Sequence, residues 1–214
     1  MLVLSHRGYW QDDIEKNQPA GFHRSFSSEF GTETDIRDYN GTLVISHDIA
    51  DDKSITVRRF LEIYNQYENN YKLPLALNIK ADGLQEQLKE LLEEYRISNY
   101  FVFDMSVPDS LQYLRQDFNV FTRESEHEKE PSFYKEAYGV WLDEFNSHWI
   151  TKEIIYNHLS NNKQICIVSP DLHKRKYRKE WQHYKEIEKA LGINNLMICT
   201  DHPGEAKEFF NESD

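Results

Sequence analysis

Short apolar runs alternate along the chain with longer segments in which apolar residues recur at helical spacing. One such segment, 85–95, places Leu88, Leu91 and Leu92 on one face and charged residues on the opposite face, which is typical of a helix that covers a sheet. The expected strands are the apolar runs Leu2–Leu4, Thr32–Ile36, Leu73–Ile79, Tyr100–Phe103, Asn119–Phe121, Gly139–Leu142, Gln164–Val168 and Leu196–Cys199. The expected helices are Ala20–Glu29, Val57–Tyr71, Leu84–Tyr95, Ser110–Gln116, Thr151–Asn161, Lys176–Leu191 and Gly204–Phe210. Strands that alternate with helices predict parallel strands joined by crossover helices.

One feature interrupts this alternation. Asn40-Gly41 lies between the runs that end at Ile36 and begin at Leu43, and Asn-Gly between two such runs is typical of a β-hairpin. Eight strand–helix units, one with a small hairpin after the second strand, favour an α/β fold of the (βα)8 TIM-barrel class. A doubly wound open sheet is the alternative, because periodicity does not distinguish closed sheets from open ones. Without a linker or a repeat, we expect residues 1–214 to form a single domain.

Composition and charge restrict the classes of partner. The chain of 214 residues is 39% hydrophobic and 29% charged, with a formal net charge of −12. Such a charge disfavours general affinity for nucleic acid or for an anionic membrane, because phosphate-rich surfaces attract basic patches. It leaves room for a small anionic substrate in a locally positive cleft. The sequence does not indicate an oligomeric state.

Targeting signals and cysteine usage favour a cytoplasmic protein. His6 and Arg7 follow the first apolar residues directly, so we expect no secretory signal. No stretch approaches the roughly 20 apolar residues that span a bilayer, and we expect no stable association with membranes. Cys166 and Cys199 each lie in a short apolar segment, and we predict buried thiols in a reducing compartment.

Polar residues follow several of the apolar runs. In a parallel barrel the carboxyl ends of the strands form the active-site face. The candidates at these ends are His6, Arg7, Glu33, Asp35, His47, Asn78 and Lys80. We therefore expect two histidines, two carboxylates and two cationic side chains to converge there.

The carboxylates suit a metal ion. Glu33 and Asp35 are two residues apart, so on a strand they point to the same side. Oxygen donors that face the same way suit one hard divalent ion, Mg²⁺ or Ca²⁺, and the side-chain oxygen of Asn78 would complete the set of ligands. A Glu-x-Asp pair considered alone is more often a solvated strand end or a salt-bridge partner.

The cationic and titratable side chains suit phosphoryl chemistry. Arg7 and Lys80 are candidate donors to a phosphoryl group. His6 and His47 would supply the base and the acid for cleavage of a P–O bond, because imidazole titrates near neutral pH. A single histidine at a strand end more often has a structural role, and the hypothesis depends on the combination.

These motifs resemble a known family. His6-Arg7-Gly8, Glu33-x-Asp35 and the segment 43–48 are similar to the N-terminal signature of glycerophosphodiester phosphodiesterases. That family belongs to a TIM-barrel group with phosphatidylinositol-specific phospholipase C and the spider sphingomyelinases D. The segments 15–22 and 198–203 also resemble family motifs in altered form. The resemblance implies the same roles for the histidines, the carboxylates, Arg7 and Lys80.

The chain departs from that family in ways that affect the site. The family usually has a metal-binding Glu where this chain has Asn78, and the insertion that often follows the His-Asp pair is absent. The basic segment 171–176 would meet a second anionic group, or simply form a solvated helix start. Similar candidates with no specific spacing are Arg123, Glu124, Trp141, Asp143 and Glu144.

We therefore predict a metal-dependent phosphodiesterase that cleaves a small, soluble, glycerophosphodiester-like compound. Two alternatives remain open. One is a lyase or isomerase acting on a sugar phosphate, and the other is a non-catalytic barrel that binds a phosphorylated ligand. Substitution of a carboxylate by Asn78 favours the last alternative, and retention of both histidines disfavours it.

Overall fold

The computed structural model describes residues 1–211. The chain divides into two compact units. We call residues Ser5–Val120 the N-terminal unit, and Met1–Leu4 together with the chain from Phe121 onward the C-terminal unit. Strand β1 (Leu2–His6) contributes residues to both units.

The N-terminal unit contains three further strands of the barrel, one hairpin strand and the helices between them. Its strands are β2 (Gly31–Tyr39), β3 (Thr42–Ile45), β4 (Leu75–Ile79) and β5 (Tyr100–Phe103). Its α-helices are α1 (Pro19–Ser27), α2 (Val57–Tyr64), α3 (Gln85–Glu94) and α4 (Val107–Arg115), with short 3₁₀ turns η1 (Asp13–Glu15) and η2 (Asn70–Lys72).

The C-terminal unit continues the same alternation. Its strands are β6 (Phe121–Ser125), β7 (Gly139–Asp143), β8 (Gln164–Val168) and β9 (Met197–Thr200). Its helices are α5 (Lys152–Ser160), α6 (Arg178–Leu191) and α7 (Pro203–Asn211), with the 3₁₀ turn η3 (Pro170–His173).

The order of hydrogen-bonded strands confirms the predicted fold class. That order is β5-β4-β2-β1-β9-β8-β7-β6, and β3 pairs with β2 from outside this path. Consecutive strands of the barrel are neighbours in this order, except β5 and β6 at its two ends, and β1 lies between β2 and β9. A doubly wound open sheet instead reverses direction along its order. The chain therefore has an α/β (βα)8 TIM-barrel fold with a small antiparallel hairpin after the second strand. The expectation of a single domain stays a prediction.

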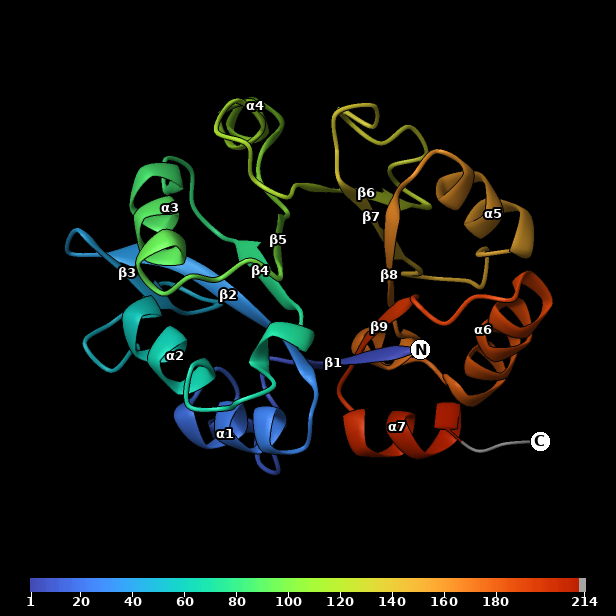
Figure 1. The fold of residues 1–214 in the computed structure, drawn as a ribbon, viewed down its shortest axis with the longest axis horizontal. Helices are drawn as coiled ribbons and strands as arrows, with labels where there is room; N and C mark the ends of the chain where they lie inside the picture. Colours follow the sequence, from blue (N-terminus) through green and yellow to red (C-terminus); the bar gives the residue numbers. More distant parts are fainter. Residues whose placement is uncertain (212–214) are drawn as a thin grey trace. The chain divides into compact units, whose positions relative to one another are not determined.

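The core of the N-terminal unit lies between its strands and its helices. Figure 1 shows α1, α2 and α3 on one side of β2 and β4. Aromatic rings join the first two helices, with ring centroids 4.7 Å apart for Phe22 and Phe60. Ile36 of β2 belongs to this core. Because neighbouring strand residues point to opposite faces, Glu33 and Asp35 face away from it and are available for a site.

One expected helix is shorter than predicted. The pattern predicted a helix over Val57–Tyr71, whereas α2 ends at Tyr64. The next residue, Asn65, accepts a hydrogen bond on its side-chain oxygen from the amide of Asn70, which also donates to the Tyr64 carbonyl. Asparagine side chains compete with the helix for backbone partners, so this Asn-rich stretch forms turns.

The core of the C-terminal unit also covers one face of its strands. Trp181 and Tyr184 of α6 are completely buried there, and the Trp181 indole N–H donates to the Ser169 hydroxyl at 2.8 Å. Cys166 and Cys199 are buried free thiols, as predicted, and the reducing compartment stays a prediction.

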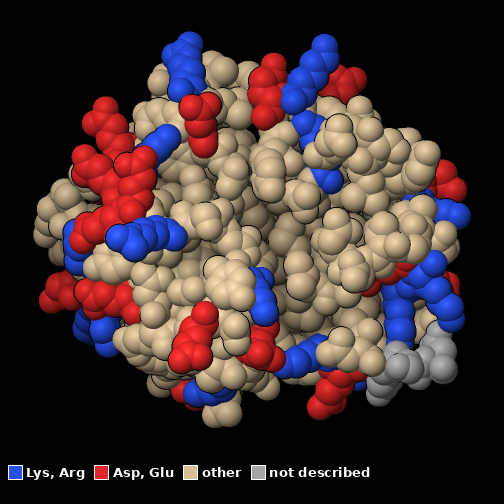
Figure 2. All heavy atoms as spheres, in the orientation of Figure 1, with Lys and Arg blue, Asp and Glu red and all other residues tan. Residues whose placement is uncertain are grey.

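Charges are interleaved on the exposed faces of α2 and α3. Figure 2 shows positive and negative side chains side by side on this part of the surface. Arg58 forms a two-pronged ion pair with Glu94, and Arg59 pairs with Glu62 at 3.0 Å. Exposed pairs of this kind contribute at most about 1 kcal/mol each.

No helix within residues 1–211 is both long and apolar enough to cross a lipid bilayer.

Candidate active site

The chain turns sharply after β1. Arg7 and Gly8 both have left-handed backbone conformations, with φ of 59° and 87°. A Cβ atom at position 8 would lie 2.9 Å from the backbone carbonyl carbon of Gly21, so glycine is required there. The left-handed conformation of Arg7 is unusual for a residue with a side chain, and such strain is concentrated at functional sites.

Both predicted phosphate ligands, Arg7 and Lys80, contact the same buried carboxylate. Asp35 is fully buried. Its Oδ2 atom lies 3.0 Å from Nε of Arg7, and its Oδ1 atom lies 3.4 Å from Nζ of Lys80. These two cations offset the cost of burying the Asp35 charge. The structure therefore places both predicted phosphate ligands beside a predicted metal ligand, an arrangement that the sequence did not specify.

Glu33 lies beside the first predicted histidine. The Arg7 backbone N–H is 3.3 Å from Oε2 of Glu33, and Nε2 of His6 is 3.9 Å from the same oxygen. Burial, and secondly the negative charge of Asp35, raise the pKa of Glu33 to about 7. Two buried carboxylates that repel each other favour protonation of one of them or a bound cation.

Asn78 is the third predicted metal ligand. It pairs with Asp35 in the register of β2 and β4, so the two side chains share one face of the sheet. Asn78 is only 7% exposed, and its side-chain oxygen is buried without a hydrogen-bond partner in the part of the chain that the structure describes. A buried acceptor without a donor is costly, and a cation would satisfy it.

His47 reaches the site through the hairpin. The Ser46 backbone N–H donates to the Asp35 carbonyl at 3.0 Å, which fixes the end of β3 beside β2. The His47 side chain is 44% exposed, and its Nδ1 atom lies 2.9 Å from Oδ1 of Asp48. His47 and Arg7 both line a pocket of about 350 Å³. The remaining lining residues are Asp13, Lys16, Asn17, Gln18, Ile45, Ser46, Asp48, Ile49, Asp51, Lys53 and Ser54.

The oxygen atoms present fit a hard divalent cation. Glu33 and Asp35 provide carboxylates, and the unpaired oxygen of Asn78 provides a neutral donor. Within residues 1–211, no three His, Cys, Asp or Glu side chains form a complete metal site. A cation here would therefore be held by two carboxylates, one amide and water, and Mg²⁺ characteristically retains several waters.

Asn17 is a site residue to which the sequence analysis gave no role. Its side-chain amide donates to Oδ2 of Asp35 at 2.8 Å, and its side-chain oxygen accepts from the Thr34 hydroxyl at 2.8 Å. Its backbone N–H donates to the Arg7 carbonyl at 2.9 Å. Asn17 has a left-handed backbone with φ of 58°, a conformation that asparagine tolerates well. It fixes the orientation of Asp35, and the only signal in the sequence was its place in the altered 15–22 motif.

Replacement of Asn17 by alanine should therefore lower turnover. We expect kcat for a phosphodiester to fall about tenfold or more, because Asp35 loses a donor that orients it. The free energy of unfolding should fall by about 1–3 kcal/mol. Steady-state kinetics and thermal melts measure both quantities. Thr34→Val is the matched control, because it removes only the hydrogen bond from the Thr34 hydroxyl to the side-chain oxygen of Asn17. Equal losses of kcat in the two variants would contradict a positioning role for Asn17.

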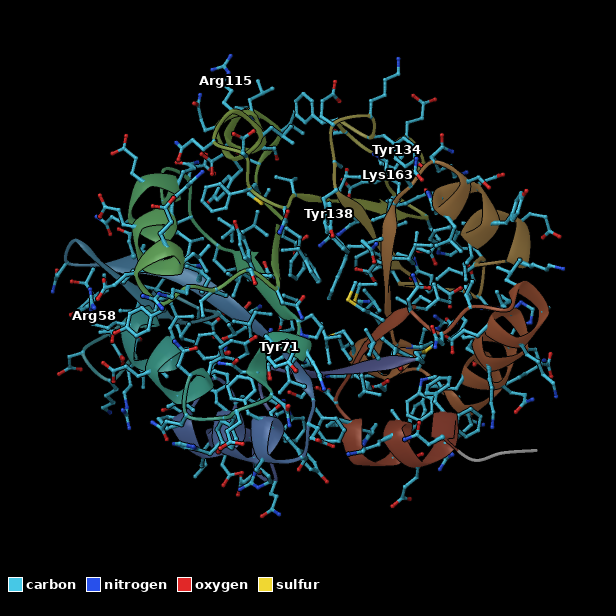
Figure 3. The ribbon with its side chains drawn as sticks, viewed as in Figure 1. Arg58, Tyr71, Arg115, Tyr134, Tyr138 and Lys163 are labelled. Atoms are coloured by element: carbon cyan, nitrogen blue, oxygen red, sulfur yellow. The ribbon has the colours of Figure 1, made fainter. Side chains whose placement is uncertain are left out.

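The candidates of the C-terminal unit have partners of their own. Asp143 lies 2.6 Å from Nε2 of His173, a residue of the basic segment 171–176. Glu124 lies 3.1 Å from Nε2 of His158, whose Nδ1 is 2.9 Å from the Tyr134 hydroxyl. Figure 3 shows Tyr134 close to Lys163, whose ammonium lies 5.0 Å from the centre of the tyrosine ring. Glu124 therefore belongs to a partly buried network around His158, and its contacts are structural.

Asp171 and Trp141 are two further candidates of this unit, and both have structural surroundings. The carboxylate of Asp171 accepts from the Thr200 hydroxyl at 3.0 Å and from the Asp201 backbone N–H at 2.8 Å. It thus ties the start of the basic segment to the end of β9. Trp141 is buried within β7.

Comparisons with known proteins identify solved structures with a similar fold. No protein-family model matches the chain, and no curated protein matches it in sequence. Among solved structures, a glycerophosphodiester phosphodiesterase from Agrobacterium tumefaciens matches with a TM-score of 0.71 and 13% identity, over 99% of this chain and 100% of its own. One from Parabacteroides distasonis matches with a TM-score of 0.67 and 13% identity, over 98% of this chain and 96% of its own.

A third solved structure is a phosphodiesterase from Oleispira antarctica in complex with its product sn-glycerol-3-phosphate. It matches with a TM-score of 0.68 and 13% identity, over 99% of this chain and 97% of its own. At such low identity the similarity concerns the fold. The resemblance found in the sequence is thus confirmed at that level, and this chain has the fold of the glycerophosphodiester phosphodiesterases along nearly its whole length.

Proposed function

We propose that the protein is a phosphodiesterase that uses one divalent cation and cleaves a small, soluble, glycerophosphodiester-like substrate. The observation that carries the proposal is the set of direct contacts at the buried carboxylates. Arg7 and Lys80 lie against Asp35, and His6 lies beside Glu33. Acidic groups of β2 thus meet cationic and titratable groups at the ends of β1 and β4, as phosphoryl chemistry requires.

Glu33, Asp35 and Asn78 are the proposed metal ligands, and Mg²⁺ or Ca²⁺ is the proposed ion. The buried, unpaired oxygen of Asn78 supports this assignment, as does the raised pKa of Glu33. The bound ion would supply positive charge that polarises a phosphoryl oxygen. With Asn in place of a third carboxylate, the site carries less negative charge, so we expect it to bind the cation loosely.

Arg7 and Lys80 are the proposed phosphate ligands. Both now pair with Asp35, so substrate binding would require them to share their N–H groups between that carboxylate and the phosphoryl oxygens. Arg7 is suited to this, because its guanidinium carries five N–H donors. Its positive charge and that of Lys80 would stabilise the charge that develops in the transition state.

His6 and His47 are the proposed proton carriers. One imidazole would take the proton of the attacking hydroxyl, and the other would give a proton to the oxygen of the leaving alcohol. The attacking group would be a water, or a hydroxyl of the substrate that forms a cyclic phosphate. Asp48, at 2.9 Å from Nδ1 of His47, would orient that ring and stabilise its protonated form.

The substrate should be small and polar. The pocket that contains Arg7 and His47 has about 350 Å³ and is lined mainly by polar and charged side chains, within the usual range for small-molecule sites. The segment after His47 leads into α2 at Val57 without an inserted domain. A cytoplasmic location, and the absence of nucleic-acid and membrane partners, stay predictions from the sequence.

Product analysis by ³¹P NMR tests the proposal. The protein would be incubated with a glycerophosphodiester and Mg²⁺ or Ca²⁺, and in a separate sample with the diester and EDTA. We expect the diester signal to give way to a phosphomonoester or a cyclic phosphate only when the metal is present. An isomerase or lyase would instead convert a sugar phosphate without consuming a diester. A binding protein would broaden or shift the diester signal without converting it.

A further inference from the structure

A second pocket belongs to the C-terminal unit and shares no lining residue with the proposed active site. It has about 340 Å³. It is formed where the chain leaves β7 for α5 and where α6 begins. Its lining residues are His148, Trp149, Thr151, Lys179, Glu180 and His183.

A buried carboxylate fixes one of the two histidines. Glu144 is completely buried, and it accepts hydrogen bonds from the backbone N–H groups of Trp149 and Ile150 at 2.8 Å and from the Tyr184 hydroxyl at 2.7 Å. Its Oε1 atom also lies 2.8 Å from Nδ1 of His148. A carboxylate held by other donors can only accept here, so Nδ1 carries the proton. The second ring nitrogen, Nε2, is then the one available to a ligand.

The second histidine lies at a distance suited to joint coordination. The rings of His148 and His183 have centroids 4.9 Å apart and perpendicular planes. Two imidazoles that bind one ion at about 2.0–2.1 Å, at angles between a right angle and a tetrahedral one, have centroids about 4.5–5.3 Å apart. No hydrogen bond holds the His183 ring within the described part of the chain, so rotation about its Cβ–Cγ bond can direct a nitrogen toward His148.

The carboxylates around the pocket offset its positive charges. Besides Glu144, Glu180 lines the pocket. Glu153 has its pKa lowered by its own backbone N–H, by the Thr151 hydroxyl and, more weakly, by charge on Lys152 and on His183, so it lies within electrostatic reach of both. Arg175 is 3.4 Å from Glu180 and offsets its charge, whereas Lys179 is the one cation in the lining. Three carboxylates therefore face three cations, and the surroundings carry no net positive charge that would repel a metal ion.

We propose that His148 and His183 bind a divalent transition-metal ion of the zinc, nickel or copper class, with Glu144 as the positioning residue for His148. Imidazole suits these ions and not Mg²⁺ or Ca²⁺. A ligating histidine whose other ring N–H is donated to a carboxylate is the usual arrangement at such sites. With two protein ligands, water completes the shell, consistent with the lack of a three-residue site within residues 1–211.

Calorimetric titration with Zn²⁺ tests this site, in buffer that contains excess Mg²⁺ to occupy the proposed active site. We expect one Zn²⁺ per chain for the wild type, and at least about tenfold weaker binding for His148→Ala and for His183→Ala. His127→Ala is the matched control. It removes a histidine of the same unit whose ring packs on Phe145, outside this pocket, and it should bind Zn²⁺ as the wild type does. Equal affinity in all four proteins would overturn the proposal.

A further variant tests whether Glu144 positions His148 for metal binding or whether the two histidines are neighbours by chance. Glu144→Gln keeps the size of the side chain and removes the charge that orients His148. We expect about 10–100-fold weaker Zn²⁺ binding, with thermal melts to establish that the variant is folded. The visible spectrum of bound Co²⁺ gives a second measurement, and it should change in both histidine variants. An unchanged spectrum in both would exclude imidazole coordination by this pair.

Discussion

Replacing His6 or His47 by alanine is expected to lower kcat for phosphodiester cleavage at least about 100-fold, because each histidine is proposed to carry one of the two protons of the reaction. The two positions differ in their surroundings. His6 lies next to the buried Glu33, whereas His47 is 44% exposed and contacts Asp48. We expect the His47 variant to keep wild-type stability, so its loss of rate would report on chemistry alone.

The pH dependence of the rate gives the matching measurement. A reaction with one acid and one base has a bell-shaped profile of kcat/KM against pH, and each alanine variant should lose one limb of it. Asp48→Ala serves as the graded control, because it keeps the imidazole and removes only its partner. We expect it to lose much less rate than His47→Ala. Wild-type turnover in either histidine variant would contradict the proposed mechanism.

Replacing Glu33 by glutamine is expected to abolish the stabilisation by metal and, at the same time, to stabilise the metal-free protein at high pH. The folded protein raises the pKa of Glu33 from 4.5 to about 7, chiefly by burial. A carboxyl with a raised pKa binds its proton more tightly in the folded state. The metal-free wild type should therefore lose stability as the pH rises from about 4.5 to about 7.

Glutamine at this position has no proton to lose, so the Glu33→Gln variant should lack this part of the pH dependence. Thermal melts at pH 5.5 and pH 8, in EDTA and in Mg²⁺ or Ca²⁺, measure both effects. In the wild type, the rise in Tm on adding metal should be larger at pH 8, where Glu33 is ionised and free to ligate. The same rise in Tm in the variant as in the wild type would show that the metal binds elsewhere.

The fold followed from the sequence because its signals are local and repeated. Most strands are short apolar runs, and Asn40-Gly41 has the turn chemistry of the observed hairpin. The exception is β6, which spans the largely polar Phe121–Ser125, whereas the apolar pattern predicted Asn119–Phe121. The end of α2 at Tyr64 was not predicted, because hydrogen bonds from the side chain of Asn70 compete with a helical pattern that continues beyond it. Spacing measures periodicity and takes no account of such competition.

The candidate site was predictable in its members and not in its contacts. Glu33 and Asp35 share a face because strands alternate, which spacing alone reveals. The pairing of Arg7 and Lys80 with Asp35, and the role of Asn17, depend on how three separate segments meet. The pocket at His148 and His183 was equally hidden, because its residues come from the loop before α5 and from the start of α6, about 30 positions apart in the sequence.

The most direct test of the central claim is the rate of hydrolysis of bis(p-nitrophenyl) phosphate by the purified protein, measured in EDTA and after addition of Mg²⁺, Ca²⁺ or Mn²⁺. We expect release of p-nitrophenol that requires a divalent ion and is lost in the Glu33→Gln variant. Hydrolysis that continues undiminished in EDTA, or in that variant, would contradict a metal-dependent phosphodiesterase at this site.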